Sequence, residues 1–193
     1  MATAMFNDTS TPLSLLTTRR SGKPRDLVAP GPSPEQLEQM IAIAARTPDH
    51  GKLAPWRFVI VDDRAALATL ITDAYRAERP QAARTEIESL EQFAHQAPAL
   101  VVVLSSPSTT SHIPRWEQEL SAGAATMNLL HAAHAMGFAG GWLTGWPTFS
   151  ETVRDAFGGP HERIAGFVFL GTPGRPLDER PRPDLARVIS HWP

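Results

Sequence analysis

Side chains able to bind an anion gather in the stretch from Arg46 to Phe58. Four possible cations lie there: Arg46, His50, Lys52 and Arg57. An apolar run at 58–61 follows at once, so the stretch should connect the end of a helix to the start of a strand. Such loops are where a rigid scaffold displays polar groups to a ligand. The alternative is a solvated loop whose charges bind nothing, and composition alone leaves both interpretations open.

A second cluster of cations stands near the start of the chain. It begins with Arg19, Arg20 and Ser21 and continues through Lys23 and Arg25. Guanidinium groups and a serine hydroxyl suit a phosphate, because they form bidentate, charge-assisted hydrogen bonds with it. A solvated basic turn is the alternative here as well.

Other chemistries have little support in the sequence. The chain has no cysteine, which excludes disulfides, thiolate metal sites and cysteine nucleophiles. His131 and His134 lack an acidic or histidine partner at ligand spacing, so no metal site is expected. Neither a phosphate-binding glycine loop nor the G-x-S-x-G elbow occurs. Two cation clusters and a Gly- and Trp-rich stretch at 138–146 therefore fit a cofactor that is both anionic and planar.

The first of these clusters should follow a well-defined helix. Ser33, Pro34 and Gln36 stand at the N-cap, N1 and N3 positions of a capping box. Thr47 precedes a proline, which disfavours helical backbone. We therefore expect this helix to end near Arg46, where a cation is favourable at the helix C-terminus.

Other elements follow from the spacing of apolar residues. The region 64–91 should be helical and broken at Pro80. Residues 98–104 are nearly all apolar, which predicts a strand buried on both faces. The remaining elements expected are helices at 12–20, 114–136 and 150–157, a turn-strand-turn at 138–146, and strands at 58–61 and 164–171.

Length and composition indicate one globular domain. The 193 residues are 42% hydrophobic, with a net charge of −2, so no basic field favours nucleic acid. No apolar stretch reaches the ~18 residues of a membrane span, and the start of the chain lacks the apolar core of a secretory signal. We expect a disordered N-terminus over 1–11, a domain over 12–176, a proline-rich C-terminal arm over 177–193, and a cytoplasmic location.

The order of five motifs resembles the FMN-dependent nitroreductase family, and most closely its minimal, single-domain bacterial NAD(P)H nitroreductases. These motifs run from about residue 13 to 173: R-R-S, A-A-R-T-P-D-H-G-K-L-A-P-W-R-F, P-R-W-E-Q-E-L-S-A-G, G-F-A-G-G-W-L-T-G and G-F-V-F-L-G-T-P. Each motif alone is weak, but the five in this order are specific. The resemblance implies an α+β fold, with a mixed sheet flanked by helices, in an intertwined homodimer with two FMN sites at the interface.

The resemblance also implies roles for particular residues. Arg19, Arg20 and Ser21 would bind FMN from one subunit, with at least one arginine on the phosphate, while Arg46 and His50 would reach the same FMN from the other subunit. Trp142, Leu143 and Thr144 match a stretch that lines the cofactor. The segment associated with the nicotinamide nucleotide is Ala132, Ala133, His134, Ala135, Met136 and Gly137. Leu143 departs from the polar or basic residue expected at its position, so a contact there would be missing or made by backbone.

The activity that the resemblance implies is hydride transfer from NAD(P)H through FMN to small electrophiles such as nitroaromatics or quinones. The flavin carries the redox chemistry while the protein positions and tunes it, which explains why no catalytic nucleophile is found. Three alternatives remain open: a flavin-binding or storage protein with little turnover, a flavin-dependent dehydrogenase or dehalogenase, and a dimeric scaffold without catalysis.

Overall fold

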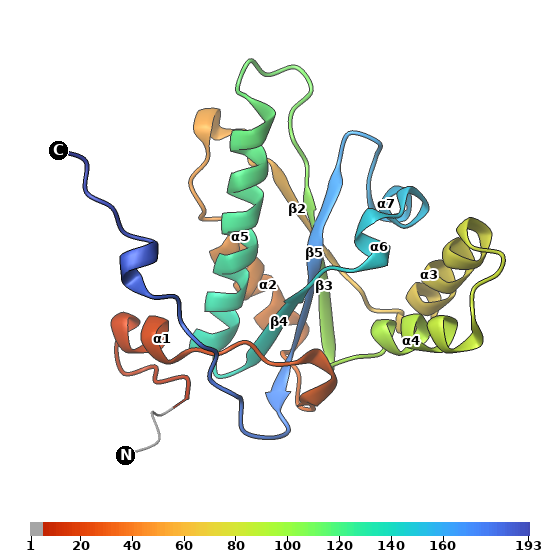
Figure 1. Cartoon of the computed structure of the whole chain (residues 1–193), viewed down its shortest axis with the longest axis horizontal. Helices are drawn as coiled ribbons and strands as arrows, with labels where there is room; N and C mark the ends of the chain where they lie inside the picture. The colour runs from red at the N-terminus through yellow and green to blue at the C-terminus, as the bar shows by residue number, and fades with distance from the viewer. Residues whose placement is uncertain (1–5) are drawn as a thin grey trace.

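Helices cover both faces of a five-stranded sheet (Figure 1). This computed structural model describes residues 6–193. Its helices are α1 (Pro12–Thr18), α2 (Pro34–Ala44), α3 (Arg64–Glu78), α4 (Arg84–Ala94), α5 (Arg115–Ala135), α6 (Trp146–Phe149) and α7 (Glu151–Phe157), with short 3-10 turns η1 (Pro24–Asp26), η2 (His50–Lys52) and η3 (Leu185–Arg187). Its strands are β1 (Leu27–Val28), β2 (Trp56–Ile60), β3 (Ala99–Ser105), β4 (Ala139–Leu143) and β5 (Arg163–Pro173).

Strand β5 is the centre of the sheet. It pairs with β3 along one side and with β4 and then β1 along the other, and β2 lies beyond β3. The α+β class is as predicted, but the expected mixed sheet needs a correction. Within residues 6–193 every pairing is antiparallel. Strand β3 runs opposite to β5, β2 runs opposite to β3, and β4 and β1 each run opposite to β5.

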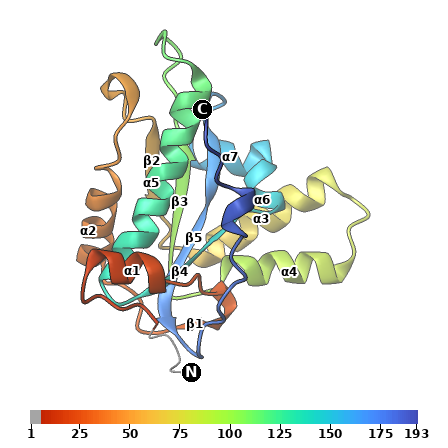
Figure 2. The ribbon, with the colours of Figure 1, turned by 60° about the vertical axis from the view of Figure 1, so that its left-hand side comes forward.

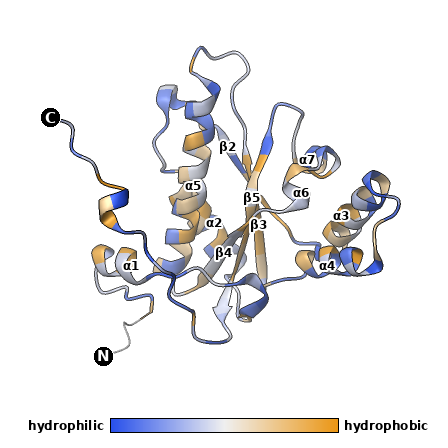
Figure 3. Cartoon of the chain, viewed as in Figure 1, coloured by the Kyte–Doolittle hydropathy of each residue, from blue (hydrophilic) through white to orange (hydrophobic). Residues whose placement is uncertain are grey.

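Alternation along the strands divides the core into two layers (Figure 2). Val101 and Val103 of β3 face α2 and α5, whereas Leu100 and Val102 face α3, α4 and α7. All seven residues of β3 are buried, as predicted for a strand covered on both faces, and Figure 3 shows the central strands as hydrophobic. Each large apolar side chain buried in this way contributes about 1.5–3 kcal/mol.

The predicted helix signals have their expected effects. The Ser33 hydroxyl accepts from Gln36 N at 3.2 Å and the Gln36 side chain accepts from Ser33 N at 2.8 Å, completing the capping box. The predicted break at Pro80 separates α3 from α4. Helix α1 ends at Thr18 rather than at residue 20, because Arg19 is already extended and caps the helix through its N–H to Leu15 O.

The two ends of the described chain differ in how they are held. Residues 6–11, part of the expected disordered stretch, have specific contacts: Asn7 donates to His134 O at 2.7 Å, and Asp8 N donates to the Thr18 hydroxyl at 2.9 Å. Residues 1–5 lie outside the described residues. After β5 ends at Pro173 the arm contacts the segment that follows α1, where Glu179 pairs with Arg20 and Asp178 with Lys23, and its last ten residues are exposed. Within residues 6–193 no helix has both the length and the apolar character to cross a bilayer.

Candidate functional site

The segment Arg19–Ser21 is held against the sheet. It joins α1 to η1, and the next residue, Gly22, donates its N–H to Gly140 O of β4 at 2.9 Å. A Cβ on Gly141 would lie 2.5 Å from Gly22 O, so only glycine at position 141 lets the two chain segments lie this close. The cation cluster is therefore placed directly beside strand β4.

Arg19 carries a donor that nothing in the described chain satisfies. Its Nη1 is buried and has no hydrogen-bond partner among residues 6–193. Burial lowers the pKa of Arg19, and the neighbouring charge of Arg182 lowers it further. A buried donor without an acceptor costs ~1–3 kcal/mol, and more when it is charged. This position is consequently suited to an anionic ligand.

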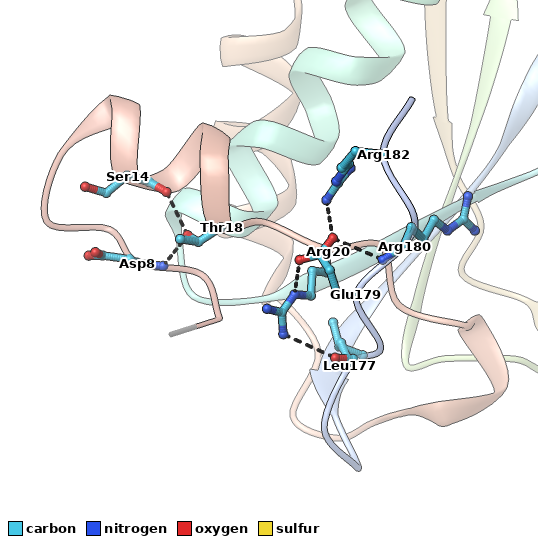
Figure 4. Close-up of polar contacts among 8 residues, drawn as sticks. All are labelled: Asp8, Ser14, Thr18, Arg20, Leu177, Glu179, Arg180 and Arg182. Carbon is cyan, nitrogen blue, oxygen red and sulfur yellow. Dashed lines mark hydrogen bonds and ion pairs between the residues drawn. The ribbon is translucent and has the colours of Figure 1, made fainter. Parts of the chain in front are cut away.

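Arg20 has a different environment, in contact with the C-terminal arm (Figure 4). Its Nε donates to Glu179 Oε2 at 2.8 Å, and its Nη1 donates to Leu177 O at 3.3 Å. Glu179 also accepts from Arg182 at 2.5 Å and from Arg180 N at 3.0 Å. The arm therefore supplies both a carboxylate and further arginines at this place.

The cation cluster opens on a small cavity. Its volume is about 120 Å3, and it is lined by Arg19, Arg20, Ser21, Asp178, Glu179, Arg180 and Arg182. A neighbouring cavity of about 150 Å3 continues along Ser21 toward Asp26 and Arg175. Four arginines and a serine line this cavity, and guanidinium and hydroxyl groups are donors that suit a phosphate.

A flat aromatic surface lies on the adjoining strand. The Trp142 indole donates from Nε1 to Ala165 O at 3.0 Å. The ring lies over Gly166 of β5, and a Cβ added to that glycine would lie only 2.0 Å from the indole nitrogen. Leu143 packs into the core beside α7, while Thr144 is exposed. The leucine found where a polar residue is expected is thus a packing residue, so a ligand contact at this position would come from its backbone.

The second predicted cluster is fixed along α5, from Asn128 beyond its middle to Glu117 near its start. Asn128 donates to the Thr47 hydroxyl at 2.6 Å, and Ser121 donates to Pro48 O at 3.1 Å. His50 Nδ1 lies 2.9 Å from Glu117 Oε2, and Arg46 is exposed. The adjacent carboxylate orients the imidazole, which presents its other nitrogen away from α5.

The structure does not bring the two clusters together within one chain. Glu117, next to His50, lies near the start of α5, whereas Arg19 acts electrostatically on His131 and His134 near its end. Glu117 and His131 are fourteen residues apart, which corresponds to ~21 Å along a helix. Figure 1 shows η2 and α1 at opposite ends of α5. A single phosphate or ring could contact both clusters only if they came from two chains.

Half of the segment predicted to contact the nicotinamide nucleotide is inaccessible. Ala132 and Ala133 are buried in the core and His134 is buried against the N-terminal segment, so within one chain these three side chains offer no surface to the nucleotide. The His134 Nδ1 lies 3.0 Å from Asn7 Oδ1, and burial, with the charge of Arg19, lowers the pKa of His134 to about 4. Only Ala135, Met136 and Gly137 present surface to a ligand.

Two site residues were missed in the sequence. Glu179 is 159 residues from Arg20, and no local pattern connects an acid in a proline-rich arm with an arginine near the start of the chain. Glu117 lies 67 residues from His50, and no local pattern connects the two residues. No group of three or more acidic or histidine residues in the described chain is arranged to hold a metal ion.

Comparison with known proteins gives a consistent result. The profile of the Nitroreductase family matches residues 16–172. A Haemophilus influenzae protein provisionally named NAD(P)H nitroreductase is 39% identical over 164 residues, which are 83% of this chain and 87% of that protein.

Solved structures share the fold. The Nitroreductase-like family protein from Bacillus cereus superposes with a TM-score of 0.77 at 19% identity, covering 100% of this chain and 98% of that one. A protein from Desulfovibrio desulfuricans, provisionally named a nitroreductase and solved in complex with FMN, superposes with a TM-score of 0.73 at 20% identity over 95% and 98% of the two chains.

Proposed function

This chain belongs to the nitroreductase family, and from that premise we propose that it is an FMN-dependent oxidoreductase. In this proposal NAD(P)H reduces the bound flavin, which then reduces small electrophiles such as nitroaromatics or quinones in a ping-pong cycle. We propose the cytoplasm as the location, because the reaction consumes NAD(P)H.

The observation that carries the proposal is the unsatisfied guanidinium of Arg19. Its buried Nη1 faces no acceptor among the described residues, and it lines a cavity with Arg20, Ser21 and two arginines of the arm. The FMN phosphate is the acceptor that fits, because one dianion can take hydrogen bonds from several of these donors. The residues that would hold the phosphate are thus Arg19, Arg20 and Ser21.

The planar part of the cofactor would lie toward β4. Trp142 is fixed flat across Gly166 and, with Thr144 and the backbone of Leu143, offers the apolar and amide contacts that a ring needs. When bound, FMN supplies hydride transfer. The protein's part is to orient the ring, exclude water and place a cation or N–H dipole where negative charge develops.

We further propose that the active unit is a homodimer. Within one chain His50 lies beside Glu117, ~21 Å along α5 from His131, the neighbour of Arg19, and we propose that Arg46 and His50 contact the FMN held by the partner. The exposed Ala135 and Gly137, with the half-buried Met136, are left for the nicotinamide nucleotide. The electron acceptor is a small molecule, which would occupy the same face of the flavin after the nucleotide leaves.

An absorbance spectrum of the purified protein, before and after NAD(P)H, tests the proposal. We expect a yellow protein whose flavin bands bleach with NAD(P)H and return when a quinone or nitroaromatic is added. A colourless protein that does not bind added FMN would contradict it. Bound flavin that NAD(P)H does not reduce would instead indicate a storage protein. A substrate panel separates the remaining alternatives: turnover of halogenated phenols would identify a dehalogenase, and reduction of the flavin by an organic hydride donor would identify a dehydrogenase.

A further inference from the structure

The first residues of the C-terminal arm, 177–182, form what we call the arm base. It lies against Arg20, as Figure 4 shows. The Glu179 carboxylate joins Arg20 at 2.8 Å and Arg182 at 2.5 Å. The hydrogen bond from Arg20 holds the pKa of Glu179 below its ordinary value, so this carboxylate is charged at neutral pH. The arm base therefore places a fixed anion beside the proposed phosphate donors.

Glu179 satisfies only some of the donors at the cavity. Its oxygens are taken up by Arg20, Arg182 and the Arg180 amide. Arg19 lines the same cavity, and its buried Nη1 has no acceptor within residues 6–193. The two carboxylates that line the cavity, Asp178 and Glu179, are outnumbered by its four arginines and leave it with a net positive charge. A phosphate ester carries ~1.5–2 negative charges at neutral pH and three acceptor oxygens, enough for both Arg19 and Arg20.

The contact between Glu179 and Arg20 is of a kind that a ligand can displace. The Glu179 side chain is 47% exposed and that of Arg20 is 15% exposed, so water reaches the carboxylate end of a pair whose fully exposed counterparts contribute only ~0–1 kcal/mol. A dianion gains by replacing the carboxylate at Arg20, because it brings more charge to the same guanidinium. An uncharged ligand gains nothing there and leaves Glu179 in place.

Resting on the proposed flavin site, we propose that Glu179 is a specificity-determining residue: an internal anion that competes with the ligand's phosphate for Arg20, so that it narrows the site's preference for phosphate esters over uncharged analogues. The carboxylate lowers the affinity for every phosphate ligand and leaves the affinity for the uncharged flavin unchanged. The arm base moves away from Arg20 when a phosphate binds.

The test compares the wild type with Glu179→Gln, using full-length protein stripped of flavin and titrated with FMN, riboflavin and inorganic phosphate. Riboflavin has the same ring without the phosphate. We expect Glu179→Gln to bind FMN roughly five- to tenfold more tightly, as removal of one nearby charge predicts, with riboflavin binding changed less than twofold. Asp184→Asn, which removes an equal charge from the arm outside the cavity, should change neither.

Each other outcome has a meaning. Weaker FMN binding by Glu179→Gln would overturn the proposal, since it would mean that Glu179 positions Arg20 for the phosphate. Unchanged FMN binding would also overturn it, since Glu179 would then not affect phosphate binding. An equal gain for riboflavin would also overturn it. If neither protein binds a flavin, the proposed function has failed. The titration with inorganic phosphate then tests the role of Glu179 by itself. Tighter phosphate binding by Glu179→Gln than by the wild type supports that role, and equal binding rejects it.

Discussion

Arg19 and Arg20 are neighbours of the same type with opposite surroundings. Arg19 has extended backbone, φ −63° and ψ 140°, so the two successive side chains point to different sides. One guanidinium is turned inward with an unmatched Nη1, and the other is bonded to the arm. At the residue scale, the unmatched donor therefore marks the ligand position more specifically than the count of arginines does.

Substitution of Arg19 should weaken cofactor binding strongly. Arg19→Gln removes a charged donor to the phosphate, and hydrogen bonds to charged groups are worth ~1.5–3 kcal/mol, so we expect FMN affinity to fall about 10- to 100-fold. Fluorescence titration of FMN measures this directly. Arg187→Gln, in the exposed turn η3, is the matched control and should bind FMN like the wild type. Equal affinity of the two variants would remove Arg19 from the site.

The buried His134 should make stability depend on pH. Its pKa is lowered from 6.5 to about 4 by burial, then by the charges of Arg19 and His131. The unfolded chain therefore binds a proton that the folded chain does not, and the free energy of unfolding should rise with pH between about 4 and 6.5. At 1.36 kcal/mol per pKa unit, His134 contributes roughly 3 kcal/mol across this window.

Urea denaturation at a series of pH values checks this slope. His134→Asn should flatten it between pH 4.5 and 6.5, whereas substitution of the exposed His161 should leave it unchanged. A slope of the same size in His134→Asn and in the wild type would show that His134 is not the group responsible.

Sequence patterns identified some residues of the site and could not identify others. The clusters at 19–21 and 46–50 and the Trp142 stretch are local in the chain, and their residue types carry the chemistry directly. Glu179 and Asn7 reach their partners across 159 and 127 residues, and only the folded chain reveals such pairs. The buried state of His134 likewise depends on which side of α5 faces the N-terminal segment.

At the scale of elements, caps and prolines were the reliable signals. The Ser33 capping box and the break at Pro80 fix where α2, α3 and α4 begin and end. The two-residue β1 and four-residue α6 were not predicted, because such short elements have no periodicity of their own. β1 exists only because Leu27 and Val28 meet the far end of β5.

The turn from α7 into β5 is held by one buried carboxylate. Burial of Glu162 acts to raise its pKa, but the net pKa is lowered because hydrogen bonds from Ser106, the Gly159 amide and Arg57 outweigh it. Arg57 donates to both carboxylate oxygens at 3.0 and 2.9 Å. The contact ties β2 to the start of β5, the strand on which the rest of the sheet is built.

Glu162→Gln should therefore destabilise the fold as a whole. The amide keeps the volume but loses acceptor capacity and charge, and we expect the free energy of unfolding to fall by about 2–3 kcal/mol. Glu119→Gln is the matched control, since Glu119 pairs with Arg115 in a largely exposed helical pair worth under ~0.5 kcal/mol. Equal urea midpoints for the two variants would mean that the carboxylate does not hold the turn.

At the scale of the whole molecule, the two clusters and the exposed apolar residues suggest one arrangement. Large apolar side chains stand in solvent on α5 and α1: Trp116 at 62%, Leu120 at 63%, Leu13 at 71% and Leu16 at 54% exposed. A two-fold axis relates identical surfaces. If it crossed α5, the start of one α5 would lie beside the end of the other, so the His50 loop would approach the partner's copy of the Arg19 cluster.

This arrangement predicts that assembly and cofactor binding are lost together. Leu120→Asp places a charge in the middle of the proposed interface, and burying an unpaired charge costs too much free energy for the dimer to form. We therefore expect this variant to be a monomer. We also expect it to bind FMN at least tenfold more weakly, because Arg46 and His50 of the second chain no longer reach the site. Light scattering after size exclusion and FMN titration measure the two effects. Phe149→Asp, at a phenylalanine of α6 that is even more exposed than Leu120, should leave a flavin-binding dimer. A wild-type monomer with full FMN affinity would show instead that one chain completes the site alone. Because His50 lies ~21 Å along α5 from the Arg19 cluster, Arg46 and His50 would then have no role in binding the cofactor.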